Sequence, residues 1–197
     1  MHRLVLCGAS AGGLHALSII LEGLPDDFAG ALAIVQHRRA DESSLLRELL
    51  ARKTRLPVIE PCHGERIQAG HVYIAPADYH LLVEAGSLSL SIDPPVNCSR
   101  PSIDVLFETG AAAYRRAAVG VVLTGANADG ALGALRLAQH GAKMIVQDPA
   151  TAEVATCPSA ALARVPGALV LPLSAIAAQL TELCGRCAAL DPPPRRC

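Results

Sequence analysis

Short, continuous apolar runs alternate with longer stretches whose apolar residues recur at helical spacing along most of the chain. Strands buried on both faces of a parallel sheet have continuous apolar runs, whereas the helices between them have one apolar face. The alternation therefore predicts an α/β fold, with a doubly wound, mostly parallel sheet and helices on both of its faces. The predicted strands cover residues 4–7, 30–36, 57–60, 70–76, 119–124, 142–147 and 167–171, and the predicted helices cover 14–21, 45–52, 102–115, 131–140, 157–164 and 174–184.

The middle of the chain has a different pattern. Apolar and polar residues alternate over residues 79–93, which predicts an inserted β-hairpin. A loop bounded by prolines, residues 94–101, follows it. Ser102 is then a predicted helix N-cap, with Asp104 as the acidic residue of the first turn.

Composition narrows the class of protein. The chain has 197 residues, which suits one domain with a single core. Hydrophobic residues make up 51% and aromatic residues 3%, so the core must be aliphatic. The net charge of -1 lacks the excess of basic residues that nucleic-acid binding normally requires, so we expect no nucleic-acid partner. Seven cysteines without a regular framework favour a reducing compartment, and no apolar stretch approaches the about 18 residues of a membrane span. We expect a cytoplasmic protein without membrane insertion.

The turn at residues 8–13 joins the first predicted strand to the first predicted helix. Gly8, Ser10 and Gly12 match G-x-S-x-G, the nucleophile elbow, in which glycines let the backbone turn sharply and expose a serine oxygen. A glycine-rich turn before a helix can equally hold a phosphate on the first helical amides. It can also be a purely structural tight turn. The turn alone leaves these three interpretations open.

Three predicted strand ends carry chemically useful residues: Ser10, His37, and Asp129 in the loop after the strand at 119–124. Loops at the carboxyl ends of parallel strands converge, so these side chains are expected to meet. A serine nucleophile needs a base and a carboxylate that orients the base, and all three groups are present. Each residue also has a structural interpretation. Asp129 can be the N-cap of the following helix, and the chain contains six other histidines, His2, His15, His63, His71, His80 and His140.

A C-x-x-C pair, Cys184 and Cys187, is the other constellation with potential chemistry. Such a pair can be half of a zinc site or a redox pair. No second pair stands at zinc-knuckle spacing, and nothing in the spacing demands that Cys62 and His63 complete a ligand set. We therefore expect neither a metal nor a cofactor. The proline-rich end, residues 191–197, is expected to belong to a flexible tail.

Five blocks, in order along the chain, together resemble one family. The blocks are the turn at residues 8–13, the strand end at 34–37, the run at 100–107, the loop at 123–130, and Gln147-Asp148-Pro149 followed by Cys157-Pro158. With these blocks the sequence, from about Arg3 to about Leu183, is similar to the catalytic domain of the CheB chemotaxis methylesterases. The resemblance implies a catalytic domain over residues 1–185, and the expected flexible tail then covers residues 186–197.

The resemblance implies a serine hydrolase of signal transduction. Members of the family remove methyl groups from glutamate γ-methyl esters on the helical cytoplasmic bundle of chemoreceptors, releasing methanol, and can deamidate receptor glutamines. By similarity Ser10 is the nucleophile, His37 is the general base and then acid, and Asp129 is the orienting carboxylate. We hypothesise that the oxyanion is held by the amide of Ala11 or by one in the loop from Gly125 to Ala128.

The sequence departs from the family pattern in two places. Family members commonly have Met-Gly-Asn where this chain has Ala126-Asn127-Ala128, which affects substrate fit at that rim. They also usually carry a phosphoacceptor receiver domain ahead of the catalytic domain, whereas the first predicted strand here begins near residue 3. We expect no control by phosphorylation within this chain, and a separate regulatory partner is one alternative.

Two other functions stay open at this point. One is a nucleotide- or phosphate-binding doubly wound domain without hydrolase activity. Dinucleotide binding would favour an acidic residue at the end of the second strand, and that strand ends instead on Gln36-His37-Arg38. The other is a hydrolase with the same triad that acts on a different ester.

Overall fold

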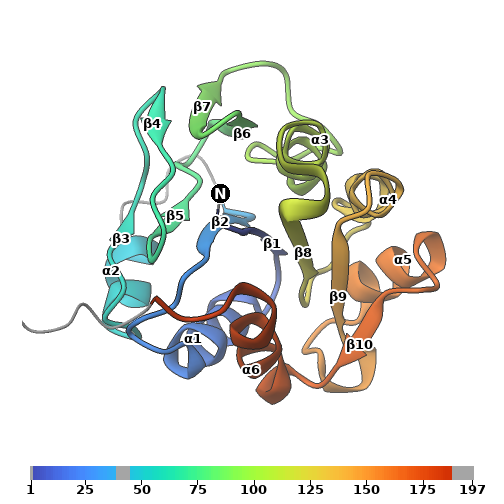
Figure 1. Cartoon of the computed structure of the whole chain (residues 1–197). Helices are drawn as coiled ribbons and strands as arrows, with labels where there is room; N and C mark the ends of the chain where they lie inside the picture. Colours follow the sequence, from blue (N-terminus) through green and yellow to red (C-terminus); the bar gives the residue numbers. More distant parts are fainter. Residues whose placement is uncertain (1, 39–44, 188–197) are drawn as a thin grey trace, which may run out of the picture.

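The computed structural model describes residues 2–38 and 45–187. A seven-stranded sheet forms its centre, in the order β10-β9-β8-β1-β2-β5-β3 (Figure 1). All of the strand pairings in this sheet are parallel, which confirms the predicted α/β architecture. The strands are β1 (Leu4–Ala9), β2 (Ala31–Gln36), β3 (Val58–Ile59), β5 (Val72–Ile74), β8 (Ala118–Val122), β9 (Lys143–Gln147) and β10 (Leu169–Leu171).

Helices cover both faces of this sheet, as the sequence pattern predicts (Figure 1). One layer contains α1 (Gly13–Gly23), α2 (Leu45–Ala51) and α6 (Leu173–Cys184), and the other contains α3 (Ile103–Tyr114), α4 (Ala131–Gln139) and α5 (Thr156–Arg164). Two 3₁₀ turns, η1 (Arg115–Ala117) and η2 (Pro149–Thr151), complete the connections. Alternation along β1 serves both layers, because Val5 and Cys7 pack in the core beneath α1 while Leu4 and Leu6 pack beneath α3.

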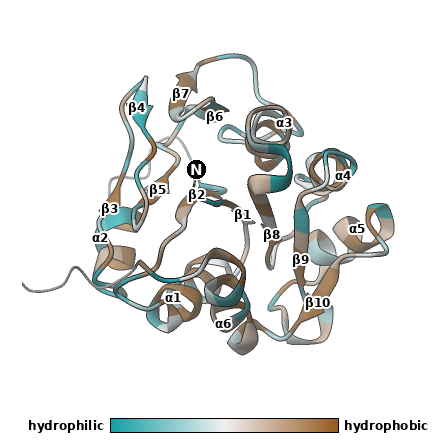
Figure 2. Cartoon of the chain, viewed as in Figure 1, coloured by the Kyte–Doolittle hydropathy of each residue, from teal (hydrophilic) through white to brown (hydrophobic). Residues whose placement is uncertain are grey.

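Aliphatic side chains dominate the two cores, and Figure 2 shows the hydrophobic colouring concentrated on the central strands. Full burial of one Leu or Ile contributes about 1.5–3 kcal/mol. Helix α3 lies especially close to β1, because a Cβ on Gly110 would collide with the side chain of Leu6. The N-terminus of α3 lies equally close to the carboxyl end of β1, because a Cβ on Gly8 would collide with the side chain of Ile103.

A second, three-stranded antiparallel sheet contains β4 (Glu65–Arg66), β6 (His80–Glu84) and β7 (Ser87–Ser91), in the order β4-β7-β6. The predicted hairpin at 79–93 is confirmed by β6 and β7. Strand β4 was not predicted, because two residues are too few to show an alternation. The hairpin is tied to α3, where the amide of Val83 donates to Thr109 Oγ1 at 3.1 Å.

The short segment after α6 is hydrogen-bonded to the loop that follows α1. The amide of Cys187 donates to the carbonyl of Asp27 at 2.6 Å. Residues 188–197 of the predicted tail lie outside the described residues. Within the described ranges, the helices are too short or too polar to cross a membrane.

Candidate active site

The three candidate residues come from neighbouring strands of the sheet. β1 pairs with β2 on one side and with β8 on the other, so the chain order of the strands reverses at β1. Ligands of open α/β sheets bind at such a switch point, beyond the carboxyl ends of the strands. Ser10 follows β1 directly, His37 follows β2 directly, and Asp129 lies between β8 and α4. The structure brings all three together.

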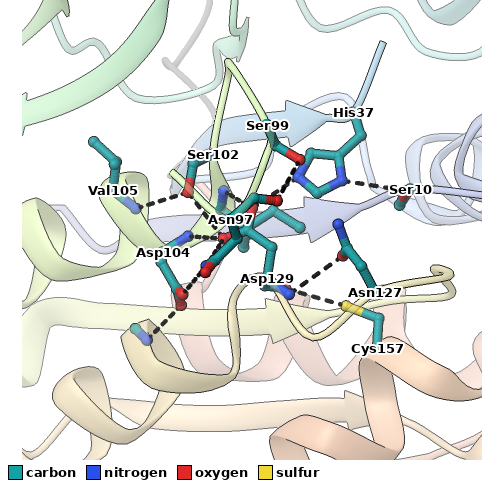
Figure 3. A network of polar contacts seen from close by, with 12 residues as sticks. Ser10, His37, Asn97, Ser99, Ser102, Asp104, Val105, Asn127, Asp129 and Cys157 are labelled. Carbon is teal, nitrogen blue, oxygen red and sulfur yellow. Dashed lines mark hydrogen bonds and ion pairs between the residues drawn. The ribbon is translucent and has the colours of Figure 1, made fainter. Parts of the chain in front are cut away.

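A chain of hydrogen bonds joins the three side chains (Figure 3). His37 Nδ1 lies 3.2 Å from Ser10 Oγ, and His37 Nε2 lies 2.7 Å from Asp129 Oδ2. An ionised carboxylate only accepts, so Nε2 carries the proton that is donated to Asp129. Nδ1 then presents its lone pair to the serine hydroxyl. This is the geometry that general-base activation of a serine requires.

Asp129 is buried and surrounded by hydrogen-bond donors. Burial alone would raise the pKa of its carboxyl group, but the hydrogen bonds from His37 and its other partners outweigh burial and lower the pKa. The carboxyl group is therefore held as the anion that fixes the histidine tautomer. The donors are His37 Nε2 at 2.7 Å, Asn97 Nδ2 at 3.0 Å, Ser102 Oγ at 2.9 Å, and the amides of Ile103 at 2.6 Å and Asp104 at 3.2 Å.

The interpretation of Asp129 as the N-cap of its own helix is wrong. Gly130, with φ of 94°, occupies the N-cap position of α4, and no side chain caps that end. The Asp129 carboxylate bonds instead to the first amides of α3, a helix that begins 26 residues earlier at Ile103. Asp129 thus accepts from a helix N-terminus that the packing of α3 against α4 brings to it.

A second buried carboxyl group, Asp104, lies beside the first. It accepts hydrogen bonds from the amide of Gly133 at 2.7 Å and from Asn97 Nδ2 at 2.8 Å. Burial raises the pKa of Asp104, and the charge of Asp129 adds to this effect. The Asn97 amide therefore bridges two carboxyl groups whose pKa values are shifted in opposite directions.

The turn that carries Ser10 is held tightly. The amide of Ser10 donates to the carbonyl of Thr124 at 2.9 Å, and the amide of Gly13 donates to the carbonyl of Ser10 at 2.8 Å. Gly12 has φ of 78°, a left-handed conformation that glycine adopts without steric cost. The predicted N-cap role of Ser102 is also confirmed, since its Oγ accepts from the amide of Val105 at 3.4 Å.

Backbone donors for an oxyanion are restricted by the other hydrogen bonds. The amide of Ala11 has no acceptor among the described residues. Gly125 is removed from the set of candidates, because its amide donates to the carbonyl of Val154 at 3.0 Å. Asn127 Oδ1 accepts from the amide of Asp129 at 3.2 Å and so fixes the turn between them. The Ala11 amide and the amides of residues 126–128 are the remaining candidates.

A cleft of about 1240 Å³ opens beside Ser10. One wall is the glycine turn and the start of α1, and the other comes from α2 and Arg38. Leu14, Leu46 and Leu49 make much of it apolar. The cleft places the serine hydroxyl within reach of a bulky substrate.

The other sequence candidates lie apart from this centre or have structural partners. His80 accepts from the amide of Ser102 at 3.2 Å through Nδ1, and its Nε2 lies 3.2 Å from the carbonyl oxygen of Pro94. Cys184 and Cys187 are free thiols at the end of α6. Across residues 2–38 and 45–187, no three His, Cys, Asp or Glu side chains are grouped as metal ligands.

Sequence reasoning missed the part that Asn97 and Ser102 have in orienting Asp129. Ser102 was predicted only as a cap, and Asn97 lies in the proline-bounded loop with φ of 50°. The one available signal was the run at residues 100–107, which belongs to the family resemblance.

Comparisons with known proteins agree on the family. The model of the CheB methylesterase family matches residues 5–180. A putative protein-glutamate methylesterase/protein-glutamine glutaminase of Leptospira interrogans serovar copenhageni is 42% identical over 177 residues, covering 89% of this chain and 92% of the relative. Protein-glutamate methylesterase/protein-glutamine glutaminase 2 of Anaeromyxobacter dehalogenans is 41% identical over 92% of this chain, which spans about half, 53%, of that longer protein.

Solved structures lead to the same family. The crystal structure of the Thermotoga maritima CheB methylesterase catalytic domain superposes with a TM-score of 0.88 and 31% sequence identity. The match covers 93% of this chain and 99% of the Thermotoga chain. The chain belongs to the CheB methylesterase family.

Proposed function

We propose that this protein is a protein-glutamate methylesterase and protein-glutamine glutaminase, with Ser10 as nucleophile, His37 as base and Asp129 as orienting carboxylate. The observation that carries the proposal is the hydrogen-bonded series from Ser10 through His37 to Asp129, in a member of the CheB methylesterase family. The names of the relatives in Leptospira and Anaeromyxobacter supply the reaction class. A phosphate-binding role for the glycine turn has no comparable support.

In the proposed reaction, Ser10 Oγ attacks the γ-carbonyl carbon of a glutamate methyl ester while its proton passes to His37 Nδ1. The tetrahedral intermediate collapses when His37 returns that proton to the methoxy oxygen, and methanol leaves. Water then attacks the acyl-enzyme while His37 accepts a proton from it, and His37 returns this proton to Ser10 Oγ as the glutamyl product leaves and ionises to the γ-carboxylate. With a glutamine side chain the same steps release ammonia. Asp129 stabilises the imidazolium throughout, because its buried carboxylate bonds to Nε2.

The oxyanion would be stabilised by backbone amides. The amide of Ala11 has no acceptor among the described residues and belongs to the residue next to the nucleophile. The amides of residues 126–128 supply candidate second donors on the opposite rim. One donor of this kind typically contributes about 3 kcal/mol to transition-state stabilisation. Although Ala126-Asn127-Ala128 differs from the family pattern, the backbone amides of these residues are still present as donors.

The substrate in this proposal is a methylated chemoreceptor, presented as part of its helical cytoplasmic bundle. The apolar wall of Leu14, Leu46 and Leu49 would pack against the receptor segment that carries the ester. In this proposal residues 1–185 form the catalytic domain, and the protein acts in the cytoplasm, where its receptor substrate presents the helical bundle. A separate regulatory protein is also part of the proposal.

The test is methanol release from a methylated receptor fragment. Ser10→Ala should lower turnover by about a million-fold, because a triad without its nucleophile retains only residual catalysis. Ser159→Ala, at an exposed position on α5, is the matched control and should keep wild-type turnover. Wild-type protein that hydrolyses small esters but releases no methanol from receptor would point to a different ester as substrate. Turnover that survives in Ser10→Ala would contradict the mechanism.

A further inference from the structure

Gln36 interrupts the hydrophobic pattern of β2 at its last residue. Leu32 and Ile34 point into the core beneath α1, whereas Ala33 and Val35 point into the core beneath α3. The alternation of a strand puts residue 36 on the same face as Leu32 and Ile34, so an apolar side chain is expected there. A polar amide occupies the position instead.

The side-chain amide of Gln36 joins the backbones of the nucleophile and the base. Its Nε2 donates to the carbonyl of Ser10 at 2.9 Å and to the carbonyl of His37 at 2.9 Å. An NH₂ group has two hydrogens, so one group satisfies both carbonyls. Neither an apolar side chain nor a carboxylate could do so. The loop after β1 and the loop after β2 are thereby connected next to the reacting groups.

The fit around this amide is close. A Cβ on Gly13 would collide with Gln36 Oε1 and would come within 2.8 Å of the Cβ of Ala9. Gln36 Oε1 itself is buried and has no hydrogen-bond partner among the described groups. A buried oxygen without a partner is unfavourable for stability. The oxygen of the amide therefore has a stability cost, which offsets part of the stabilisation from the two hydrogen bonds of Nε2.

We propose that Gln36 is a positioning residue, which fixes the distance between Ser10 and His37 by clamping their carbonyls. The inference rests on the proposed function, because it assumes that Ser10 and His37 react together. The contact between Ser10 Oγ and His37 Nδ1 is 3.2 Å long, at the outer limit of a hydrogen bond. A misplacement of about 1 Å between reacting groups can cost about a hundredfold in rate.

The experiment compares wild type with Gln36→Leu and Gln36→Met, which remove both donors while keeping the side-chain volume. For each variant, kcat and KM for methanol release, the rate of Ser10 labelling by a small fluorophosphonate, and the melting temperature are measured. We expect kcat and the labelling rate to fall together by about ten- to a hundredfold. KM and the melting temperature should stay close to wild type. Gln179→Leu, on α6 away from the site, is the matched control and should change none of these values.

Wild-type kcat and labelling rates in both Gln36 variants would overturn the positioning role. A loss of activity that only follows a fall in the folded fraction would overturn it as well. Wild type that is labelled at Ser10 but releases no methanol would contradict the proposed function, and the labelling comparison would still decide the role of Gln36. Wild type that is not labelled at Ser10 would overturn both.

Discussion

Two helices, α1 and α3, start at the edge of the sheet where Ser10, His37 and Asp129 meet, and their first turns differ. The first amides of α3, those of Ile103 and Asp104, are occupied by the carboxylate of Asp129. The first turn of α1 begins after Gly12 without any side-chain cap and opens on the cleft. Both N-termini carry the partial positive charge that favours an anion. In the described structure the first amides of α3 donate to a carboxylate, whereas the first turn of α1 has no side-chain cap.

The two N-termini separate a permanent anion from a transient one. Asp129 stays ionised although it is buried, because α3 and its neighbours donate to it, and it can therefore hold His37 in one tautomer. The Ala11 amide beside α1 stays free of acceptors in the described structure, so it is available when charge develops on a substrate oxygen. The α3 amides are filled by Asp129, which keeps His37 oriented in both acylation and deacylation. The Ala11 amide is left open, so it can accept the oxyanion that forms in each of these two stages.

Of the variants that test this difference, Asp129→Asn should lower kcat the most. The asparagine NH₂ group would replace an acceptor that faces several donors, and His37 would lose the partner that fixes its tautomer. We expect kcat for methanol release to fall by about ten-thousandfold, as for an orienting aspartate elsewhere. The control is Asp26→Asn, an exposed carboxylate paired with Arg55, which should leave kcat unchanged. A loss of less than about tenfold would contradict the orienting role.

The same variant gives a pH test by urea unfolding. The pKa of Asp129 is lowered in the folded protein, so its carboxylate stabilises the fold above the unfolded pKa, and this stabilisation is lost as pH falls through the folded pKa. Asp104 has a raised pKa and contributes with the opposite sign. The unfolding free energy of wild type should therefore fall more steeply below about pH 4 than that of Asp129→Asn. Equal slopes in a pair of proteins that both carry Asp104→Asn, which removes the opposite contribution, would show that Asp129 is not held ionised by its donors.

Ser102→Ala should have a smaller effect, because Asp129 keeps the amides of Ile103 and Asp104 as donors. The variant removes the donation of Ser102 Oγ to Asp129 and the cap on the amide of Val105. Loss of a helix cap costs about 1 kcal/mol of unfolding free energy, measured by urea titration. Loss of one donor among several should lower kcat by about five- to tenfold. Ser174→Ala, in the first turn of α6, is the control, and a Ser102→Ala variant with wild-type kcat would show that Ser102 is only a cap.

Much of this site could be predicted from the sequence, because the strand pattern is strong and local. Continuous apolar runs locate β1, β2 and β8, and the convergence of strand ends by itself indicates Ser10, His37 and Asp129. The partner of Asp129 could not be predicted in the same way. A local interpretation assigned its carboxylate to the following helix, but the close approach of Gly130 and Gly133 to α3 brings it to Ile103 instead. Contacts of this kind depend on tertiary packing and leave no periodic signal.

Asn97 and Gln36 show two further limits of local patterns. Asn97 reaches Asp129 from an irregular loop, in which no periodicity indicates the direction of a side chain. Gln36 did interrupt a visible apolar pattern. The sequence could not say which backbone groups its amide would meet, since Ser10 lies 26 residues away. Both residues act on the site through contacts that only the folded chain creates.

The open N-terminus of α1 can be tested with Gly12→Ala, which should have the smallest effect on turnover. Gly12 has φ of 78°, and an added Cβ would come within 2.7 Å of Glu153 Oε2 and 2.8 Å of Glu153 Cβ. The left-handed conformation costs an alanine about 1 kcal/mol, and the contact with Glu153 requires a further shift of the turn. If the neighbouring Ala11 amide holds the oxyanion, this shift should lower kcat by about fivefold. KM should not change, because the oxyanion exists only beyond the ground state.

Gly64→Ala separates backbone strain from displacement of the α1 turn. Gly64 has φ of 81°, and an added Cβ there would meet nothing within 4 Å. Gly64→Ala should therefore lose about 1 kcal/mol of unfolding free energy in urea titrations, from the left-handed conformation alone, and Gly12→Ala should lose at least as much, because its Cβ also meets Glu153. Only Gly12→Ala should also lose turnover. Equal kcat values in the two variants would mean that the first turn of α1 can move without affecting the transition state, and the oxyanion would then have to be held from residues 126–128 alone.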